Sequence, residues 1–481
     1  MKRVIPIFTI LIMILAITLS SGIKPVSAQL FNVSWASGYQ VLNPSLTEDA
    51  TIFISYYNED GTLATLNNTA NPVQDTVARS SSNNYYPIHS LEGFRGSIVI
   101  SSTLPVFVIT NVVINTPAQG TGSYVGINQG ATVLNFPLVV KGNANQTSVL
   151  TIQNTSDTSA DITIKFTPLV GSTFPAIADV TDTIPAFASH SFDLSTLAAF
   201  SGVSRWVGAA SVSVTDTTND RIAGVSNTVN VGVSTAYQLA TYNAFSSAGS
   251  TTVVLPLIQE NNNGNRTGIS CQNVGSSPTT ISITYKKAGD NYVDKAPQSV
   301  SDVPVGGMAV FIQDYTGTAK FVGSAVVSST PASNMVCIVN QQKLSNGSYS
   351  SYEGFNPSVA SEEVVLPLIV SRNGKPTTGY TYTAFSIATA DGLPHPVTCD
   401  FIPSPGFADV PDQTMTGATS VFSQHDIYGT GARFIGSAKC KIDDYGTAGV
   451  GIFAVVNQTR QNSPVPFRDI LSTYNGFNIS P

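Results

Sequence analysis

Apolar and polar residues alternate in short runs along most of the chain, and this pattern predicts β-strands. The third quarter of the sequence shows the alternation most clearly, because Gly, Asn, Ser and Pro separate its runs. The strands predicted there are residues 253–258, 267–273, 279–287, 307–313, 321–329 and 334–341. No run of helical period extends beyond a turn or two, so the pattern predicts an all-β protein.

The same series of strands recurs four times, and each copy closes with an aromatic tag. The tags are Tyr124-Val-Gly-Ile-Asn128, Tyr242-Asn-Ala-Phe245, Tyr352-Glu-Gly-Phe-Asn356 and Tyr474-Asn-Gly-Phe-Asn478. They lie roughly 110 to 120 residues apart, which is about the length of one domain. Seven or so strands in that length is the size of an immunoglobulin-like sandwich. We therefore predict four tandem immunoglobulin-like β-sandwich domains that form an elongated rod.

The tags also place the predicted boundaries. Residues 1–28 are a signal peptide, and residues 29–128 form the first sandwich, which has a shortened opening strand. Residues 129–245, 246–356 and 357–481 form the other three sandwiches. The linkers between them are short, so we expect neighbouring domains to touch.

Further motifs recur at corresponding positions of the copies. An opening strand carries Phe136-Pro-Leu-Val139, Leu255-Pro-Leu-Ile258 or Leu366-Pro-Leu-Ile369, and a late strand starts at Phe94-Arg-Gly-Ser97, Trp206-Val-Gly-Ala209, Phe321-Val-Gly-Ser324 or Phe434-Ile-Gly-Ser437. The second strand ends in Gln153-Asn154 or Gln272-Asn273, whereas copy one has Leu42-Asn43 and copy four has Thr389.

This motif set resembles repeat modules of secreted, surface-exposed proteins of filamentous bacteria of the Chloroflexota type. The resemblance covers most of the chain after the signal peptide. Its motifs are packing and turn residues, so it implies an architecture and surface exposure and no activity.

The first 28 residues have the order of a secretory signal. Lys2 and Arg3 precede an apolar run over residues 4–19, and small residues lead to a predicted cleavage between Ala28 and Gln29. The alternative is an uncleaved membrane anchor, which the short run and the polar residues after it disfavour. We expect an exported protein, extracellular or at the cell surface, without a transmembrane anchor.

Composition narrows the expected partners. Charged residues make up only 11 % of the chain and the formal net charge is −7, so no basic stripe is present to meet nucleic-acid phosphates. Expected partners are copies of the chain itself or other envelope components. Glycans are an alternative partner, which would bind the exposed faces of Tyr56-Tyr57, Tyr85-Tyr86, Tyr349 and Tyr352. The competing interpretation is that these rings pair across strands and stabilise the sheets.

The four cysteines allow three pairings. Aligning the copies places all four at inward-facing positions, one on an early and one on a late strand of copies three and four. We predict disulfides Cys271–Cys337 and Cys399–Cys440, with four buried thiols as the alternative. No His or second Cys pair has metal-ligand spacing, so no metal is expected.

Candidate chemistry is otherwise sparse. The four histidines do not recur between copies and no nucleophile elbow is present, so we predict no catalytic, cofactor or metal residues and no enzyme. Sequons, at about their chance frequency for this composition, make candidate glycosylation sites of Asn32, Asn67, Asn145, Asn154, Asn265, Asn346, Asn457 and Asn478. We expect an exported structural protein of a sheath, surface layer, filament or stalk, with an adhesin or glycan-binding protein as the alternative.

The first copy differs from the others in its opening. Once the signal peptide is removed, residues 30–33 leave no room for the usual opening strand. Either this copy closes with a shorter first strand, or its free edge accepts a strand from another subunit and produces head-to-tail polymers.

Overall fold

The computed structural model describes residues 8–14, 34–116, 120–230, 237–246, 248–313, 319–343, 347–375, 379–423, 433–461 and 471–479. Strands dominate this part of the chain, and its one α-helix is the four-residue α1 (Tyr445–Ala448). The prediction of an all-β protein is therefore confirmed.

The strands fall into four consecutive groups, which we call units 1 to 4, and each group forms two antiparallel sheets. Unit 1 contains β1 (Phe8–Ile14), β2 (Ser34–Asn43), β3 (Ala50–Asn58), β4 (Val73–Val77), β5 (Ser81–Tyr85), β6 (Gly96–Ser102), β7 (Phe107–Thr116) and β8 (Gly120–Val125). Unit 2 contains β9 (Val133–Lys141), β10 (Gln146–Asn154), β11 (Ala160–Pro168), β12 (Val180–Ile184), β13 (Ser189–Asp193), β14 (Trp206–Val214), β15 (Ile222–Asn230) and β16 (Gln238–Asn243).

Units 3 and 4 follow the same plan. Unit 3 contains β17 (Thr252–Glu260), β18 (Asn265–Asn273), β19 (Thr279–Lys287), β20 (Gln298–Val303), β21 (Met308–Ile312), β22 (Phe321–Thr330), β23 (Met335–Lys343) and β24 (Ser348–Glu353). Unit 4 contains β25 (Glu363–Ser371), β26 (Asn373–Lys375), β27 (Gly379–Thr389), β28 (His395–Pro403), β29 (Gln413–Gly417), β30 (Thr419–Ser423), β31 (Phe434–Ile442), β32 (Ile452–Gln461), β33 (Leu471–Asn475) and β34 (Phe477–Ile479).

The strand order repeats from unit to unit. One sheet, the opening sheet, has the order β9–β14–β11–β12 in unit 2, and its equivalents are β1–β6–β3–β4, β17–β22–β19–β20 and β25–β31–β28–β29. The other sheet, the tag sheet, has the order β13–β10–β15–β16 and ends on the strand that carries the tag tyrosine. Apolar residues at alternate positions fill the space between the sheets. In β3, for example, Ile52 and Ile54 are fully buried while Phe53 between them is exposed.

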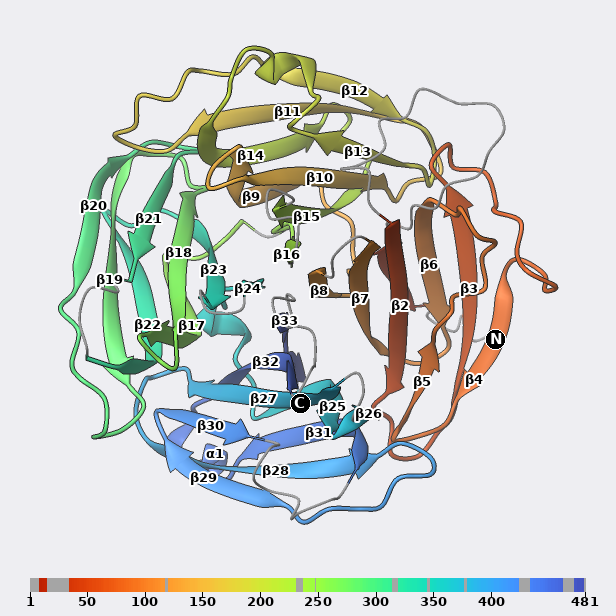
Figure 1. Cartoon of the computed structure of the whole chain (residues 1–481), viewed down its shortest axis with the longest axis vertical. Coiled ribbons are helices and arrows are strands. Elements are labelled where there is room, and N and C mark those ends of the chain that lie inside the picture. The colour runs from red at the N-terminus through yellow and green to blue at the C-terminus, as the bar shows by residue number, and fades with distance from the viewer. Residues whose placement is uncertain are drawn as a thin grey trace.

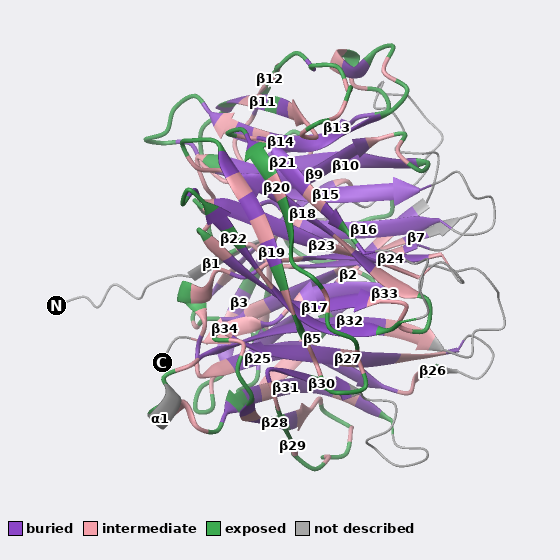
Figure 2. Ribbon diagram, turned by 90° about the vertical axis from the view of Figure 1, so that its left-hand side faces the viewer, coloured by how far each residue is buried: buried purple, intermediate pink, exposed green. Residues whose placement is uncertain are grey.

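The four units form a ring, not the elongated rod predicted from the sequence (Figure 1). The tag strands β8, β16, β24 and β33 meet at its centre, and β4, β12, β20 and β29 lie at its rim. Unit 4 closes onto unit 1: the Phe107 and Phe477 rings lie 4.5 Å apart, and Gln40 Nε2 donates a hydrogen bond of 3.1 Å to the Pro367 carbonyl. The ring forms because each tag strand is a sheet edge that packs against its neighbours around the centre. Figure 2 shows that the strands are mostly buried and that exposed residues concentrate in the connections.

A proline bulge marks the opening strand of units 2, 3 and 4. In unit 2, Val139 pairs with Gly208 and Phe136 with Ala210, so Pro137 and Leu138 together oppose one residue. The bulge takes Leu138 out of the ladder, and the hydroxyl of the tag residue Tyr242 donates to its carbonyl at 2.6 Å. The same arrangement recurs where Tyr352 and Tyr474 bond Leu257 and Leu368.

Both disulfides join neighbouring strands. Cys271 on β18 is bonded to Cys337 on β23, and Cys399 on β28 is bonded to Cys440 on β31, which are the predicted pairs. In each case the two residues are directly opposite in register, and both side chains point into the core.

The opening position of unit 1 is taken by β1, which belongs to the apolar run of the predicted signal peptide. It pairs antiparallel with β6, from Phe8 opposite Ser102 to Ile14 opposite Gly96. The predicted cleavage residues Ala28 and Gln29 lie outside the described residues, as do Asn32 and Asn346.

Candidate binding site at the centre of the ring

The residue after each tag tyrosine ends a tag strand at the centre of the ring. These four residues are Val125, Asn243, Glu353 and Asn475, which we call the hub residues. The tyrosines before them are all buried. Tyr242, Tyr352 and Tyr474 lie in the cores of units 2, 3 and 4, and Tyr124 lies in an apolar cluster that units 1 and 2 share. The next residue points to the opposite side of the strand from its tyrosine, because side chains alternate along a strand.

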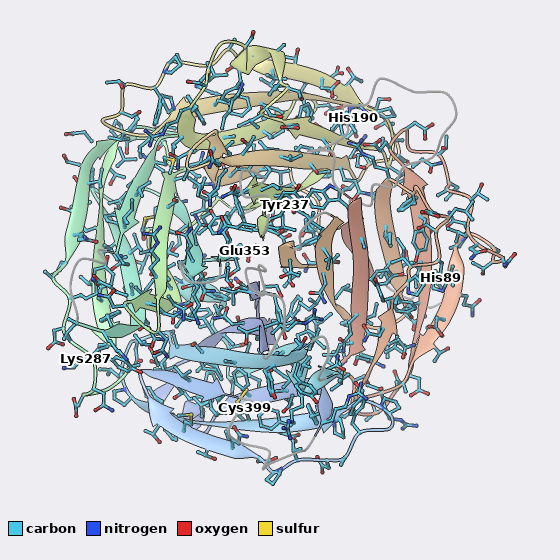
Figure 3. The ribbon with its side chains drawn as sticks, in the orientation of Figure 1. His89, His190, Tyr237, Lys287, Glu353 and Cys399 are labelled. Atoms are coloured by element: carbon cyan, nitrogen blue, oxygen red, sulfur yellow. A yellow bond between two sulfur atoms is a disulfide. The ribbon has the colours of Figure 1, made fainter. Side chains whose placement is uncertain are left out.

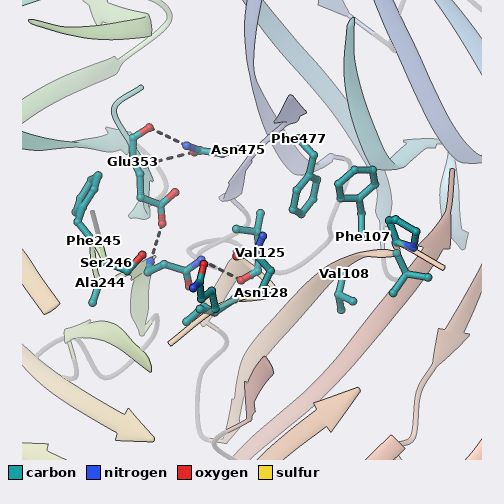
Figure 4. A pocket seen from close by; sticks show the side chains of 16 residues that line it. Phe107, Val108, Val125, Asn128, Ala244, Phe245, Ser246, Glu353, Asn475 and Phe477 are labelled. Carbon is teal, nitrogen blue, oxygen red and sulfur yellow. Dashed lines mark hydrogen bonds between the residues drawn. The ribbon is translucent and has the colours of Figure 1, made fainter. Parts of the chain in front are cut away.

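Hydrogen bonds connect the hub residues across three of the four unit boundaries (Figure 4). Asn243 Nδ2 donates to the Val125 carbonyl at 2.9 Å, and the Asn243 backbone N–H donates to Glu353 Oε1 at 2.6 Å. Asn475 Oδ1 accepts a hydrogen bond from the Glu353 backbone N–H at 3.3 Å. Asn475 Nδ2 donates a second one to the Glu353 carbonyl at 2.8 Å. These bonds fix the side chains of Asn243, Glu353 and Asn475 at the centre.

A pocket of about 840 Å³ opens beside the hub residues and is lined by residues of all four units. Apart from the hub residues themselves, its lining comes from the start of β7 and from the segments that follow the tag strands. These lining residues are Pro105, Val106, Phe107, Val108, Gly126, Ile127, Asn128, Gln129, Ala244, Phe245, Ser246 and Phe477. A volume of this size accepts a small organic ligand or a sugar residue or two.

Glu353 is the one acid among the residues that line this pocket. Burial of the carboxyl raises the pKa of Glu353 to about 7, although the Asn243 N–H bond opposes the increase. Its charge therefore changes near neutral pH. Figure 3 places Glu353 at the centre of the ring and His89 and His190 toward the rim.

The aromatic residue of each tag contacts the next unit or lines the pocket. Phe477 packs on Phe107 of unit 1, and Phe355 packs on Phe453 of unit 4 at 4.8 Å between ring centroids. Phe245 lines the pocket, and the first tag has Ile127 in place of the aromatic ring. The pocket thus offers aromatic faces, amide groups and one carboxyl, a combination suited to a polar organic ligand.

Most aromatic residues that the sequence suggested as a sugar-binding face are part of the core. Tyr56 is fully buried, and Tyr85 stacks on Tyr39 at 4.8 Å. Tyr57 stacks on Phe187 of unit 2. Tyr349 and Tyr352 are also buried, whereas Tyr86 is 72 % exposed. Of these rings, Tyr85 pairs across strands, with Tyr39 on β2. The others, except Tyr86, are buried or stacked elsewhere within the fold.

The described histidines are bonded within the fold and do not approach the hub. His190 Nδ1 lies 2.7 Å from Asp182, and His89 Nδ1 lies 3.1 Å from the Tyr56 hydroxyl. His395 lies between two carboxylates, and its hydrogen bond with Asp444 raises its pKa. His425 lies outside the described residues.

The candidate glycosylation sites differ in accessibility. Asn154 is fully buried and its Nδ2 donates to the carbonyls of Thr158, Ile184 and Pro185, so this candidate site is inaccessible in the folded chain. Asn265 Nδ2 also donates a hydrogen bond, to Asn262, and Asn457 Nδ2 donates one to Gln341. Asn478 Nδ2 donates to both Ser361 and Ile452. Asn67 and Asn145 are exposed.

Two kinds of feature are absent from the described residues. Within them, no group of three or more His, Cys, Asp or Glu residues is placed to hold a metal ion. Within them, too, no helix is long and apolar enough to cross a membrane.

Comparisons with known proteins add little. No family model and no curated protein matches the chain. Among solved structures, the crystal structure of Thermotoga maritima 1070 aligns with 24 % of this chain and 96 % of its own length, at 18 % sequence identity and a TM-score of 0.20. A likeness of that size carries no argument about function.

Proposed function

We propose that this is an exported, non-enzymatic protein of the cell surface that binds a glycan in the pocket at the centre of the ring. The observation that carries the proposal is the pocket itself, which all four units build and which contains the lone acid Glu353. The two disulfides favour an oxidising compartment, in agreement with export.

The lining chemistry supports a glycan over other small ligands. Phe107, Phe245 and Phe477 supply apolar faces against which the C–H face of a sugar ring packs. Asn128 and Glu353 supply amide and carboxyl groups for the hydroxyls around the ring edge. The low overall charge of the chain fits a neutral ligand better than a polyanion.

Glycan binding to the purified chain from Gln29 onward tests the proposal, first on an array and then by titration calorimetry. Phe245→Ala and Glu353→Gln should each weaken binding about tenfold or more, the effect of losing one good contact. Tyr86→Ala is the matched control, because Tyr86 is exposed far from the pocket, and it should leave affinity unchanged. Binding that survives both pocket changes but is lost with Tyr86 would move the site to the rim and contradict the proposal.

A structural subunit of the envelope is the second candidate, and a different observation supports it. The opening strand position in unit 1 is completed by a segment of the predicted signal peptide. Removing that segment would leave β6 with a free edge, which is a site for assembly with another chain. Electron microscopy of the purified exported protein should then show ordered assemblies, and monodisperse single rings at high concentration would contradict this second candidate.

A further inference from the structure

The edge of β6 in unit 1 is a slot for an opening strand, as the other three units show. β6 stands where β14, β22 and β31 stand, and these strands pair with the opening strands β9, β17 and β25. In the structure the slot holds β1. Whether β1 is the occupant for which the slot is built can be judged from the buried groups around it.

β1 does not reproduce the geometry of the other opening strands. Its pairing with β6 runs without a register shift, from Ile14 opposite Gly96 through Met13 and Ile12 to Phe8. Each of the other three opening strands shifts register where its proline lies, between Gly208 and Ala210 on β14 in unit 2, for example. The bulge presents the backbone of the leucine after the proline to the tag tyrosine. In unit 3, Leu257 accepts from the Tyr352 hydroxyl at 2.7 Å and donates its N–H back at 3.1 Å.

The corresponding tyrosine of unit 1 lacks this bond. Tyr124 is 3 % exposed, and its hydroxyl has no hydrogen-bond partner among the described residues. Thr110 lies nearby, and its hydroxyl also has no hydrogen-bond partner among the described residues. A buried hydroxyl without a partner is costly, so the position of Tyr124 indicates that a bulged strand is missing.

We propose that the slot on β6 receives an extended strand from a companion exported chain, with the sequence apolar-Pro-Leu at its bulge. The inference rests on export and on cleavage at Ala28, as in the proposed function, because cleavage removes β1. The companion is a different chain rather than a second copy. All three apolar-Pro-Leu strands of this protein, β9, β17 and β25, are already paired inside their own units.

The first measurement separates this inference from the proposed export. The intact mass of the protein recovered from its native envelope shows whether residues 8–14 remain. A chain that starts at Gln29 leaves the slot open for a partner. An exported chain that retains residues 8–14 would overturn the inference while leaving export itself intact. A chain that is not exported would instead overturn the proposed function.

The second measurement tests the slot directly with a peptide of sequence 252–260, which carries the opening strand of unit 3. Fluorescence anisotropy should show one labelled peptide bound per chain from Gln29 onward, and none bound to the chain that retains β1. The Pro256→Ala peptide should bind about tenfold more weakly, the worth of one or two hydrogen bonds. Tyr124→Phe in the protein should abolish that preference for proline.

Two outcomes of the peptide measurement would overturn the inference. One is an absence of peptide binding to the chain from Gln29 onward, and the other is equal binding of both peptides to the protein with Tyr124 intact. Sizing of this chain at rising concentration, without peptide, gives a third check. Growth into polymers would show that a second copy, and not a companion chain, fills the slot.

Discussion

The carboxyl of Glu353 should make the stability of the ring depend on pH, and Glu353→Gln should remove that dependence. Burial raises the pKa of Glu353 from 4.5 to about 7, so the folded chain holds a proton that the unfolded chain has released at intermediate pH. The contribution of this group is therefore fully present below pH 4.5 and is lost as the pH rises through about 7. A shift of this size corresponds to about 3 kcal/mol of unfolding free energy. Glutamine keeps an oxygen for the Asn243 N–H and does not ionise.

Equilibrium urea unfolding of both chains at pH 4.5 and pH 8 measures the effect. The difference in unfolding free energy between Glu353→Gln and the parent chain should move by about 3 kcal/mol in favour of the variant between these two pH values. All other titratable groups are present in both chains and cancel in the difference. Glu92→Gln, which changes an exposed carboxyl away from the hub, is the matched control. Parallel pH profiles for Glu353→Gln and the parent would refute the assignment of a protonated, buried carboxyl.

The remaining predictions concern packing and accessibility. Tyr352→Phe should lower the unfolding free energy by about 2 kcal/mol, because it leaves the buried N–H and carbonyl of Leu257 unsatisfied. Tyr124→Phe, in the chain that retains β1, should not lower the unfolding free energy. Phe477→Ala should cost about 3 kcal/mol and speed limited proteolysis at the boundary between units 4 and 1, whereas an unchanged digestion rate would show that the ring closes without it. Replacing Cys399 and its partner by alanine should lower stability by about 3 kcal/mol in a urea titration, and equal midpoints would show that the bridge contributes nothing. Peptide mapping of the exported protein should find no glycan on Asn154, because its side chain is inaccessible; a modified Asn154 would contradict the core assignment.

The alternation of apolar and polar residues was sufficient to predict most strands and the core. It identified six strands of unit 3, the opening strands of units 2 to 4 and the strand positions of all four cysteines, because each of these has one face in the core. Two strands of unit 3 escaped it. β20 reads Gln-Ser-Val-Ser-Asp-Val, and β24 reads Ser-Tyr-Ser-Ser-Tyr-Glu. In β24 small polar side chains are buried at the centre of the ring, as Ser350 is against Thr473, so an apolar pattern is not required there.

The ring itself could not be predicted in the same way. In copies two to four, the tag tyrosine packs into the core of its own unit. The residue after it, however, bonds to other units, and a single copy of the motif contains no information about the angle between neighbours. A signal was nevertheless present: the hub position varies as Val125, Asn243, Glu353 and Asn475 while the tyrosine before it does not vary. A position that changes from copy to copy beside an unchanged core residue indicates a surface where the copies meet.

The fourfold repeat of the units fails at two places, the hub and the slot on β6. Packing alone does not explain the residues found at either place. At the hub, Asn243 and Asn475 already connect units 1 to 2 and 3 to 4 by side-chain amides, and an amide at Glu353 would serve the boundary between units 2 and 3 equally well. The acid instead carries a pKa of about 7, so its ionisation weakens the fold above neutral pH. At the slot, Tyr124 is buried without the bulged strand that satisfies the other three tag tyrosines. Both sites therefore carry a cost in the isolated chain that a bound ligand or strand would remove. These two sites, the centre of the ring and the edge of unit 1, are therefore where we propose that a ligand and a companion strand bind.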